Sequence, residues 1–251
     1  MTRTAVVAGV GPGLGASVAR RFAAEGLQVA LLARTESYLT ELAAELDAQE
    51  GDGTGLAVPT ELAAPDDVAR AFESVREAFG RVDVLVYNAS AATWDGLLDC
   101  EPAAFDRALA VGVRGAFDCA REAASDMLAD AADADAGMDA GGTPAGETRG
   151  VVVLTGATTS VRGRKGAVGF SAAKFGARGL AESMARELGP RGVHVAHVVI
   201  DGGIRPTGRE VDDPEAYLDP DAVADAYWDL VEQDRSAWTL ELDLRPYVEE
   251  F

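Results

Sequence analysis

Short runs of β-branched residues alternate along the chain with longer segments of helical periodicity. Strands are predicted at residues 4–9, 28–33, 56–61, 83–88, 150–155, 193–200 and within 237–244, and helices at 14–25, 36–48, 66–79, 102–128, 169–188 and 219–231. Some of these strands are almost continuously apolar, which is typical of strands buried on both faces of a parallel sheet. The predicted fold class is therefore α/β: a single doubly wound, Rossmann-like domain over residues 1–251, with about seven mostly parallel strands and helices on both faces.

Residues 129–149 interrupt this pattern with a segment of low complexity. The segment consists mostly of Ala, Asp and Gly and holds almost no large side chain that could be buried. We interpret it as a solvated surface insertion before the fifth strand. The alternative is a cation-binding loop that uses Asp130, Asp133, Asp135 and Asp139. Because these residues lack the alternating ligands and the terminal glutamate of a calcium loop, no metal site is predicted.

The chain is strongly acidic and almost free of lysine. Its 251 residues include 22 Lys plus Arg against 42 Asp plus Glu, a formal net charge of −20, and Lys165 and Lys174 are the only lysines. Such a surface repels nucleic acids and anionic membranes, so neither is an expected partner. We find no apolar run that could span a membrane, no targeting peptide, and no disulfide or zinc spacing around Cys100 and Cys119. A soluble, cytoplasmic protein is expected.

A glycine-rich loop lies between the first predicted strand and the first predicted helix. Its sequence is Gly9-Val-Gly-Pro-Gly13-Leu-Gly15. Glycines at such a turn let backbone amides at the positive end of a helix approach a pyrophosphate without obstruction by a Cβ atom. A lone glycine motif is weak evidence, but a strand before it, a helix after it and a second strand near residue 28 favour a dinucleotide-binding loop over a structural turn.

Three further segments follow this loop in order. They are Glu61-Leu62 after the third predicted strand, Tyr87-Asn88-Ala89-Ser90 after the fourth, and Phe170-Ser171-Ala172-Ala173-Lys174 in the helix at 169–188. Together with Gly9-x-x-x-Gly13-x-Gly15 they resemble the short-chain dehydrogenase/reductase superfamily, over residues 4–203. The resemblance implies a nicotinamide cofactor bound by Gly9, Gly13, Leu14, Gly15, Arg34, Glu61, Leu62, Asn88, Lys174 and Ile204. Ile204 follows a turn that has one residue more than the corresponding Pro-Gly turn of the family.

Arg34 ends the second predicted strand, where the family distinguishes its two cofactors. A carboxylate at this place binds the ribose 2′-hydroxyl of NAD, whereas an arginine can bind the 2′-phosphate of NADP. Arg34 therefore favours NADP(H), with NAD(H) as the alternative. Arg34 could instead be a surface cation that pairs with Glu36.

The proton-transfer residues of the family are substituted in this chain. The resemblance places the family tyrosine at Phe170, the substrate-orienting serine at Ala157 and the asparagine of the preceding long helix at Gly112. Phenylalanine has no hydroxyl and can neither donate nor accept a proton. Lys174 is retained four residues after Phe170, and Thr158 is the candidate substitute for the missing donor.

Two hypotheses follow for the function. The first is an NADP(H)-dependent oxidoreductase with a non-standard active site and an unknown small-molecule substrate. The alternative is a catalytically inactive cofactor-binding protein, such as a redox sensor or a subunit of an oligomer. The resemblance also implies a homodimer or homotetramer.

The scarcity of lysine and the surplus of acid suggest adaptation to a high-salt cytoplasm. The alternative is an acidic protein encoded by a GC-rich genome. Self-repulsion of the acidic surface destabilises the folded chain, and salt screens that repulsion. We therefore expect the melting temperature, measured by circular dichroism, to rise between low and molar KCl. An unchanged or falling melting temperature would contradict adaptation to salt.

Overall fold

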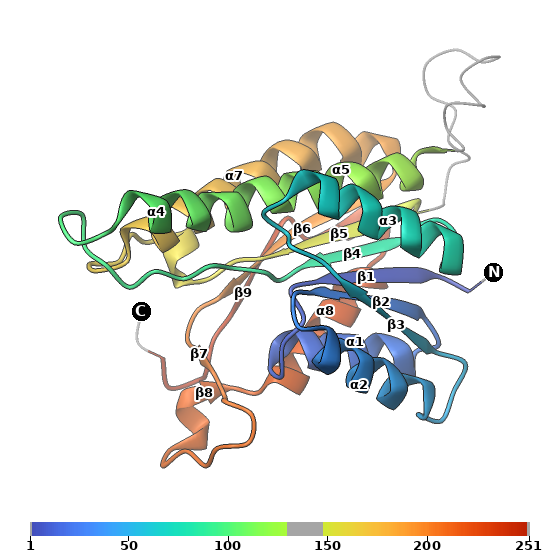
Figure 1. Ribbon diagram of the computed structural model, residues 1–251, viewed down its shortest axis with the longest axis horizontal. Coiled ribbons are helices and arrows are strands. Elements are labelled where there is room, and N and C mark those ends of the chain that lie inside the picture. The colour runs from blue at the N-terminus through green and yellow to red at the C-terminus, as the bar shows by residue number, and fades with distance from the viewer. Residues whose placement is uncertain (1, 130–147, 250–251) are drawn as a thin grey trace.

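A computed structural model describes residues 2–129 and 148–249. Its centre is a seven-stranded sheet in the order β3-β2-β1-β4-β5-β6-β9, in which every neighbouring pair is parallel (Figure 1). The strands of this sheet are β1 (Thr4–Ala8), β2 (Gln28–Ala33), β3 (Thr54–Pro59), β4 (Val84–Tyr87), β5 (Gly150–Thr155), β6 (Val193–Ile200) and β9 (Glu241–Leu244). Two short strands, β7 (Gly203–Ile204) and β8 (Tyr217–Leu218), pair separately beside it. The predicted fold class is confirmed.

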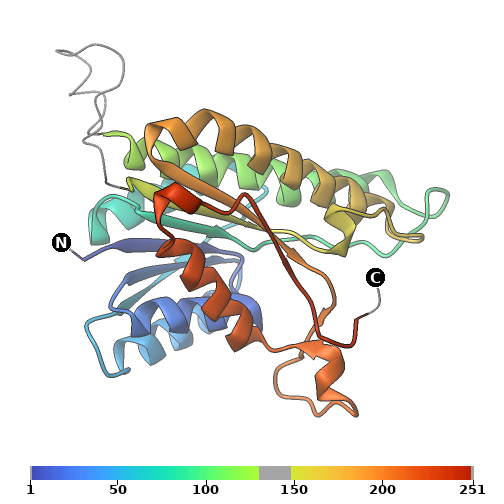
Figure 2. The same ribbon diagram turned by 180° about the vertical axis from the view of Figure 1, so that it is seen from behind.

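Helices cover both faces of the sheet (Figures 1 and 2). One face carries α1 (Leu14–Ala24), α2 (Glu36–Asp47) and α8 (Pro220–Val231), and the other carries α3 (Pro65–Phe79), α4 (Pro102–Leu109), α5 (Ala116–Met127) and α7 (Val168–Leu188). Successive residues of β1 point to opposite faces: Val7 belongs to the core under α1 and α8, and Val6 to the core under α3 and α5. Two apolar cores, separated by the sheet, therefore hold the strands in place.

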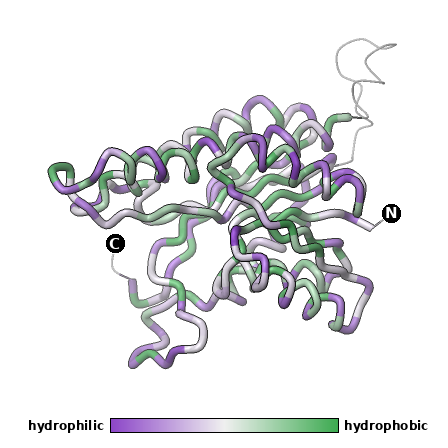
Figure 3. The backbone as a smooth tube through the Cα atoms, viewed as in Figure 1, coloured by the Kyte–Doolittle hydropathy of each residue, from purple (hydrophilic) through white to green (hydrophobic). Residues whose placement is uncertain are grey.

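The apolar strands predicted from the sequence are buried on both faces. All residues of β1, β5 and β6 are buried, and the strands form the hydrophobic centre of the molecule in Figure 3. The predicted bounds of β2, β5 and β6 agree with the structure, whereas β3 begins two residues earlier and β9 is confined to Glu241–Leu244. The first residue of the predicted last strand, Ala237, instead ends a short 3₁₀ helix at Arg235–Ala237.

The strand order places a binding site at one particular edge. From β1 the chain proceeds through β2 and β3 on one side, and then crosses to β4 on the other side. At such a reversal the loops after the two central strands diverge and leave a crevice at the carboxyl ends of the strands. Here the two loops are the glycine loop after β1 and the segment that begins at Asn88 after β4.

The predicted helix at 102–128 is interrupted. Residues Ala110–Gly115 form a π-helical segment between α4 and α5. At its centre, a Cβ atom on Gly112 would lie 2.8 Å from the Cβ atom of Ala173 on α7. The absence of a side chain at Gly112 therefore permits the close approach of this segment to α7. Apolar periodicity did not predict the interruption because a single π-helical segment hardly alters the spacing of apolar residues.

Several sequence predictions concern groups that the structure describes only in part. The predicted insertion lies, apart from its ends, outside the described residues, as do Asp130, Asp133, Asp135 and Asp139. Within residues 2–129 and 148–249 there is no cluster of side chains that could hold a metal ion, and no helix there is long and apolar enough to cross a membrane. Cys100 and Cys119 are free thiols.

Candidate functional site

The glycine loop makes its closest contact with the segment after β4. Gly9 has a φ of +97°, and a Cβ atom there would overlap the backbone of Ala89. A Cβ atom on Gly15 would lie 2.7 Å from the carbonyl oxygen of Gly9, whereas one on Gly13 would meet no atom within 4 Å. Gly9 and Gly15 are thus required by the turn itself, and Gly13 leaves open space beside the first turn of α1.

Asn88 links the two loops through hydrogen bonds. Its side-chain Nδ2 donates a hydrogen bond to the carbonyl oxygen of Gly9 at 2.9 Å, and its backbone N–H donates to the carbonyl oxygen of Ala8 at 2.7 Å. The amides at the start of α1 are therefore held beside the end of β4. This arrangement suits the binding of an anionic group at the helix N-terminus.

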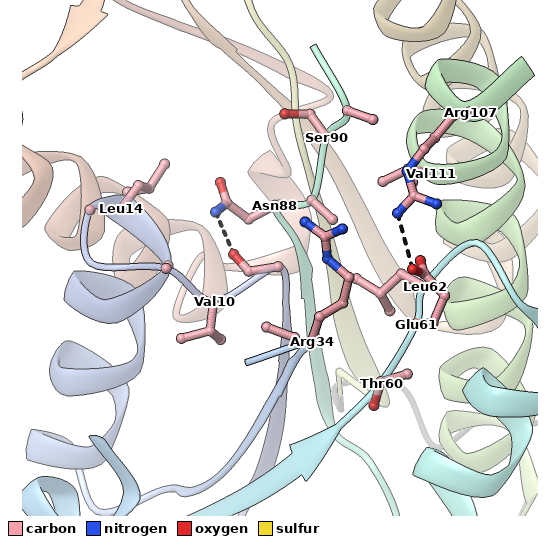
Figure 4. A pocket seen from close by; sticks show the side chains of 17 residues that line it. Val10, Leu14, Arg34, Thr60, Glu61, Leu62, Asn88, Ser90, Arg107 and Val111 are labelled. Carbon is pink, nitrogen blue, oxygen red and sulfur yellow. Dashed lines mark hydrogen bonds and ion pairs between the residues drawn. The ribbon is translucent and has the colours of Figure 1, made fainter. Parts of the chain in front are cut away.

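A pocket of about 370 Å³ opens between the glycine loop and the ends of β2, β3 and β4 (Figure 4). The structure brings together here nearly all of the residues that were predicted to bind the adenosine half of a cofactor. They are Gly9, Gly13, Leu14, Gly15, Arg34, Glu61, Leu62 and Asn88. Leu62 is buried and contributes an apolar wall, while the side chain of Arg34 extends into the pocket (Figure 4).

Charges around this pocket favour an ionised Glu61. Its carboxylate accepts hydrogen bonds from the backbone N–H of Ala63 at 3.1 Å and from Arg107 at 3.0 Å. Burial alone raises the pKa of Glu61, but these hydrogen bonds and the charges of Arg107 and Arg34 lower it below its ordinary value. The charge of Arg34 therefore interacts with the carboxylate of Glu61 on the opposite wall of the pocket.

A second, larger cleft continues from the first pocket. It has a volume of about 1300 Å³ and shares Gly13, Leu14, Asn88 and Ser90 with the first pocket. Ala157, Thr158, Phe170, Lys174 and Ile204 line it, as predicted for residues around the reacting end of the cofactor. Gly112 lines neither space, because it is buried against Ala173.

Lys174 is a buried cation at the floor of the cleft. It is 5% exposed, and its Nζ donates a hydrogen bond to the carbonyl oxygen of Thr155 at 2.7 Å. Among the residues that the structure describes, no carboxylate forms an ion pair with it. Burial lowers the pKa of Lys174 to about 8. Its remaining N–H donors are available to a hydroxyl group bound in the cleft.

Phe170 and Thr158 flank this lysine with different chemistry. The Phe170 ring lies 5.4 Å from the Trp94 ring and 5.7 Å from Lys174 Nζ, so it forms an apolar wall. The Thr158 hydroxyl donates a hydrogen bond to Asp201 Oδ1 at 2.6 Å. Asp201 is buried and also pairs with Arg162 and Arg245, at 3.4 and 3.2 Å. Thr158 therefore offers the cleft a hydroxyl group that is hydrogen-bonded to a buried carboxylate.

The two histidines of β6, His194 and His197, are buried. His194 stacks on Trp238 with ring centroids 5.0 Å apart, and its ring nitrogens bond to the carbonyl oxygens of Leu230 and Thr239. His197 Nδ1 lies 3.1 Å from a carboxylate oxygen of Glu241. Neither histidine lines the cleft.

Sequence reasoning missed several residues that line the cleft. Trp94, Arg162, Arg164 and Lys165 come from the loops after β4 and β5. Because the carboxyl ends of parallel strands meet at one edge, their position directly after two predicted strands was the available signal. Their mutual contacts, such as the Arg164 guanidinium 5.1 Å from the Trp94 ring, required the structure.

Comparison with known proteins identifies the family. Residues 3–212 match the family model described as short chain dehydrogenase. The chain belongs to this family. Sorbitol-6-phosphate 2-dehydrogenase of Escherichia coli is 32% identical over 200 residues, which cover 80% of this chain and 71% of that protein.

Solved short-chain dehydrogenase structures resemble the whole chain. A short-chain dehydrogenase from Rhodopseudomonas palustris superimposes with a TM-score of 0.78 at 34% identity, over 98% of this chain and 99% of that one. A metagenomic short-chain oxidoreductase in complex with NADP superimposes with a TM-score of 0.79 at 27% identity, over 98% of each chain. The roles of the individual site residues in the present chain stay predictions.

The burial of Lys174 has a measurable consequence for stability. Its pKa falls from an ordinary 10.5 to about 8 in the folded chain, so the unfolded chain binds more protons between these pH values. The loss of folding free energy that results from burying the ammonium is largest below pH 8 and decreases as the pH rises toward 10.5. We expect Lys174→Met to melt at or above the wild-type temperature at pH 7, with the difference narrowing toward pH 10. A Lys174→Met protein that melts well below wild type at pH 7 would contradict this account.

Proposed function

We propose that this short-chain dehydrogenase is an NADP(H)-binding oxidoreductase with a non-standard active site. The observation that carries the proposal is the continuity of two spaces at the reversal of strand order. The glycine loop and Arg34 line the first space, and Lys174 lines the second. A dinucleotide placed along them would reach from the end of β2 to the start of α7.

The residues present fit such a cofactor. Open space beside Gly13 and the N-terminus of α1 suits the pyrophosphate, and Leu62 suits the apolar adenine. Lys174 has unused N–H donors for the hydroxyls of the nicotinamide ribose. Arg34 extends into the pocket at the place where a 2′-phosphate would lie, and the NADP complex of the metagenomic relative supports the same choice.

Removal of Arg34 should change the preference between the two cofactors. We expect Arg34→Gln to weaken NADPH binding about tenfold, because a charge-assisted contact to the 2′-phosphate is lost, and to leave NADH binding nearly unchanged. Titration of cofactor fluorescence measures both constants. Arg70→Gln removes the same charge at an exposed position on α3, outside both spaces, and is the control. Equal losses for NADPH and NADH would refute the assignment of Arg34.

The chemistry around the nicotinamide must proceed without the phenol of the family. The bound cofactor would supply or accept a hydride. Of the chain's own groups, Thr158 offers a hydroxyl in the cleft, and Asp201 accepts its proton in a hydrogen bond of 2.6 Å. Because its own proton is directed at Asp201, Thr158 Oγ1 would accept a hydrogen bond from a substrate hydroxyl or a bound water and so orient it, with the proton for reduction supplied by water or by the substrate itself. Tyr87 and Tyr227 are buried outside the cleft, and burial raises the pKa of each.

The alternative function is that of a catalytically inactive cofactor-binding protein. The packing of Phe170 against Trp94 and of Ala173 against Gly112 favours it. Ala173 occupies the space that any side chain at Gly112 would need. The chain thus differs from the family pattern by a consistent set of apolar and small residues rather than by one substitution.

Turnover by a repaired variant separates these two functions. We expect Phe170→Tyr combined with Ala157→Ser to raise NADPH-dependent reduction across a panel of carbonyl compounds by about 10² or more, because a general acid is restored beside Lys174. Phe79→Tyr, at the end of α3 and outside both spaces, is the control. Substantial turnover by the wild type, unchanged in the double variant, would show that Thr158 or water suffices. Cofactor binding without turnover in either protein would favour the inactive alternative.

We also propose that the protein works in the cytoplasm as a homodimer or homotetramer. Two free cysteines suit a reducing compartment. Phe117 on α5 and Phe175 on α7 are 43% and 42% exposed on the same helical layer (Figure 1). Large apolar side chains that are exposed on neighbouring helices are typical of a surface covered by a second subunit.

A further inference from the structure

We propose that the large cleft binds an anionic substrate: a carbonyl or alcohol compound that carries a carboxylate or a phosphate group. This inference rests on the proposed function and names the substrate class of the same site. It is carried by the charges, the aromatic wall and an unpartnered hydroxyl group of the cleft.

The cleft reverses the charge balance of the chain. The chain as a whole has 22 basic against 42 acidic residues. The charged residues that line the cleft are five cations and one carboxylate, namely Arg162, Arg164, Lys165, Lys174, Arg205 and Glu249. Both lysines of the chain are among them. A solvated surface of this protein would show an excess of acid, so the local excess of cations indicates a ligand of opposite charge.

Two exposed cations without a carboxylate partner among the described residues lie together in the loop before α7. Arg162 pairs with Asp201, and Arg205 pairs with Asp219. By contrast, within the described part of the chain neither Arg164 nor Lys165 forms an ion pair. An anion bound beside these two residues would therefore meet charges that no carboxylate in residues 2–129 and 148–249 offsets.

An aromatic wall adjoins these cations. The loop after β4 and the loop before α7 lie side by side, and the N–H of Val168 donates a hydrogen bond to the carbonyl oxygen of Asp95 at 3.1 Å (Figures 1 and 2). Trp94 from the first loop contacts both Phe170 and the guanidinium of Arg164. The body of a ligand could thus pack on the two rings while its charged group reaches Arg164 and Lys165.

A buried hydroxyl group adds an independent sign of a ligand. Thr159 is 2% exposed and lines the cleft, and its Oγ1 has no hydrogen-bond partner among the described residues. A buried polar group without a partner is costly, and because this oxygen has less than 1 Å² of exposed surface, a ligand would reach it only after a local rearrangement of the cleft.

The phosphates of the cofactor do not account for the cations of this loop. The glycine loop, with open space beside Gly13, would hold the pyrophosphate, and Arg34 faces the other pocket. Arg164 and Lys165 line only the larger cleft. In the sequence they lie between β5 and Lys174. A second anion, distinct from the cofactor, fits them.

Three ketones of matched shape test the proposal. They are 4-acetylbenzoate, 4-acetylphenyl phosphate and the neutral methyl 4-acetylbenzoate, and their binding is measured by isothermal titration calorimetry with and without saturating NADP⁺. We expect at least one of the two anions to bind about tenfold or more tightly than the ester. Comparison of the two anions distinguishes a carboxylate site from a phosphate site.

Charge variants locate the binding. We expect Arg164→Gln combined with Lys165→Gln to weaken binding of the preferred anion about tenfold or more and to leave the ester unchanged. Arg121→Gln, exposed on α5 and outside both spaces, controls for net charge, and melting curves control for folding. Equal binding of anions and ester, equal losses in Arg121→Gln, or displacement of the anion by NADP⁺ would overturn the proposal.

The outcome for the substrate class is separable from the outcome for the oxidoreductase. Anion binding that depends on Arg164 and Lys165, in a protein that binds no cofactor, would support the anion site and reject the proposed function. Cofactor binding without preference for the anions would support the proposed function and reject the anion site.

Discussion

The structure depends on one close approach, between the glycine loop after β1 and the segment after β4. Gly9, with a positive φ and no side chain, lets the loop lie against the backbone of Ala89, and the amide of Asn88 is hydrogen-bonded to the Gly9 carbonyl oxygen. The two halves of the sheet are therefore joined where their loops diverge. Both spaces of the candidate site open from this junction, so a ligand bound there would contact both halves of the domain.

Lys174 shows that the site is built for a ligand rather than for stability. An ammonium group that is buried without a carboxylate reduces the stability of the folded chain, and one hydrogen bond to Thr155 offsets only part of that cost. The resemblance to the family places its tyrosine at Phe170 and its lysine at Lys174. Its retention is explained most simply if the bound molecule supplies the hydrogen-bond acceptors that the protein does not.

Much of the fold, but less of the site, follows from the sequence. The bounds of β2, β5 and β6 were predictable because each is rich in apolar residues; the fold buries β5 and β6 completely and β2 except at its two end residues. The glycine loop was predictable because a strand precedes it and a helix follows it. The π-helical segment was not, and neither was the close approach of Gly112 to Ala173 on another helix, which the sequence pattern does not contain. Neither was the contact between Thr158 and Asp201, which joins the ends of two strands through space.

The contrast between an acidic exterior and a basic cleft has a consequence for the conditions under which anions bind. At low salt the field of a chain with net charge −20 extends over tens of ångströms and opposes the approach of any anion. At about 1 M salt the screening length falls to about 3 Å, so the long-range repulsion by the acidic surface disappears, and contacts with exposed cations such as Arg164 weaken as well. If the cleft binds an anion as proposed, salt would therefore act on binding in two opposing ways: it would remove the long-range repulsion by the acidic surface, and it would weaken the attraction by the exposed cleft cations.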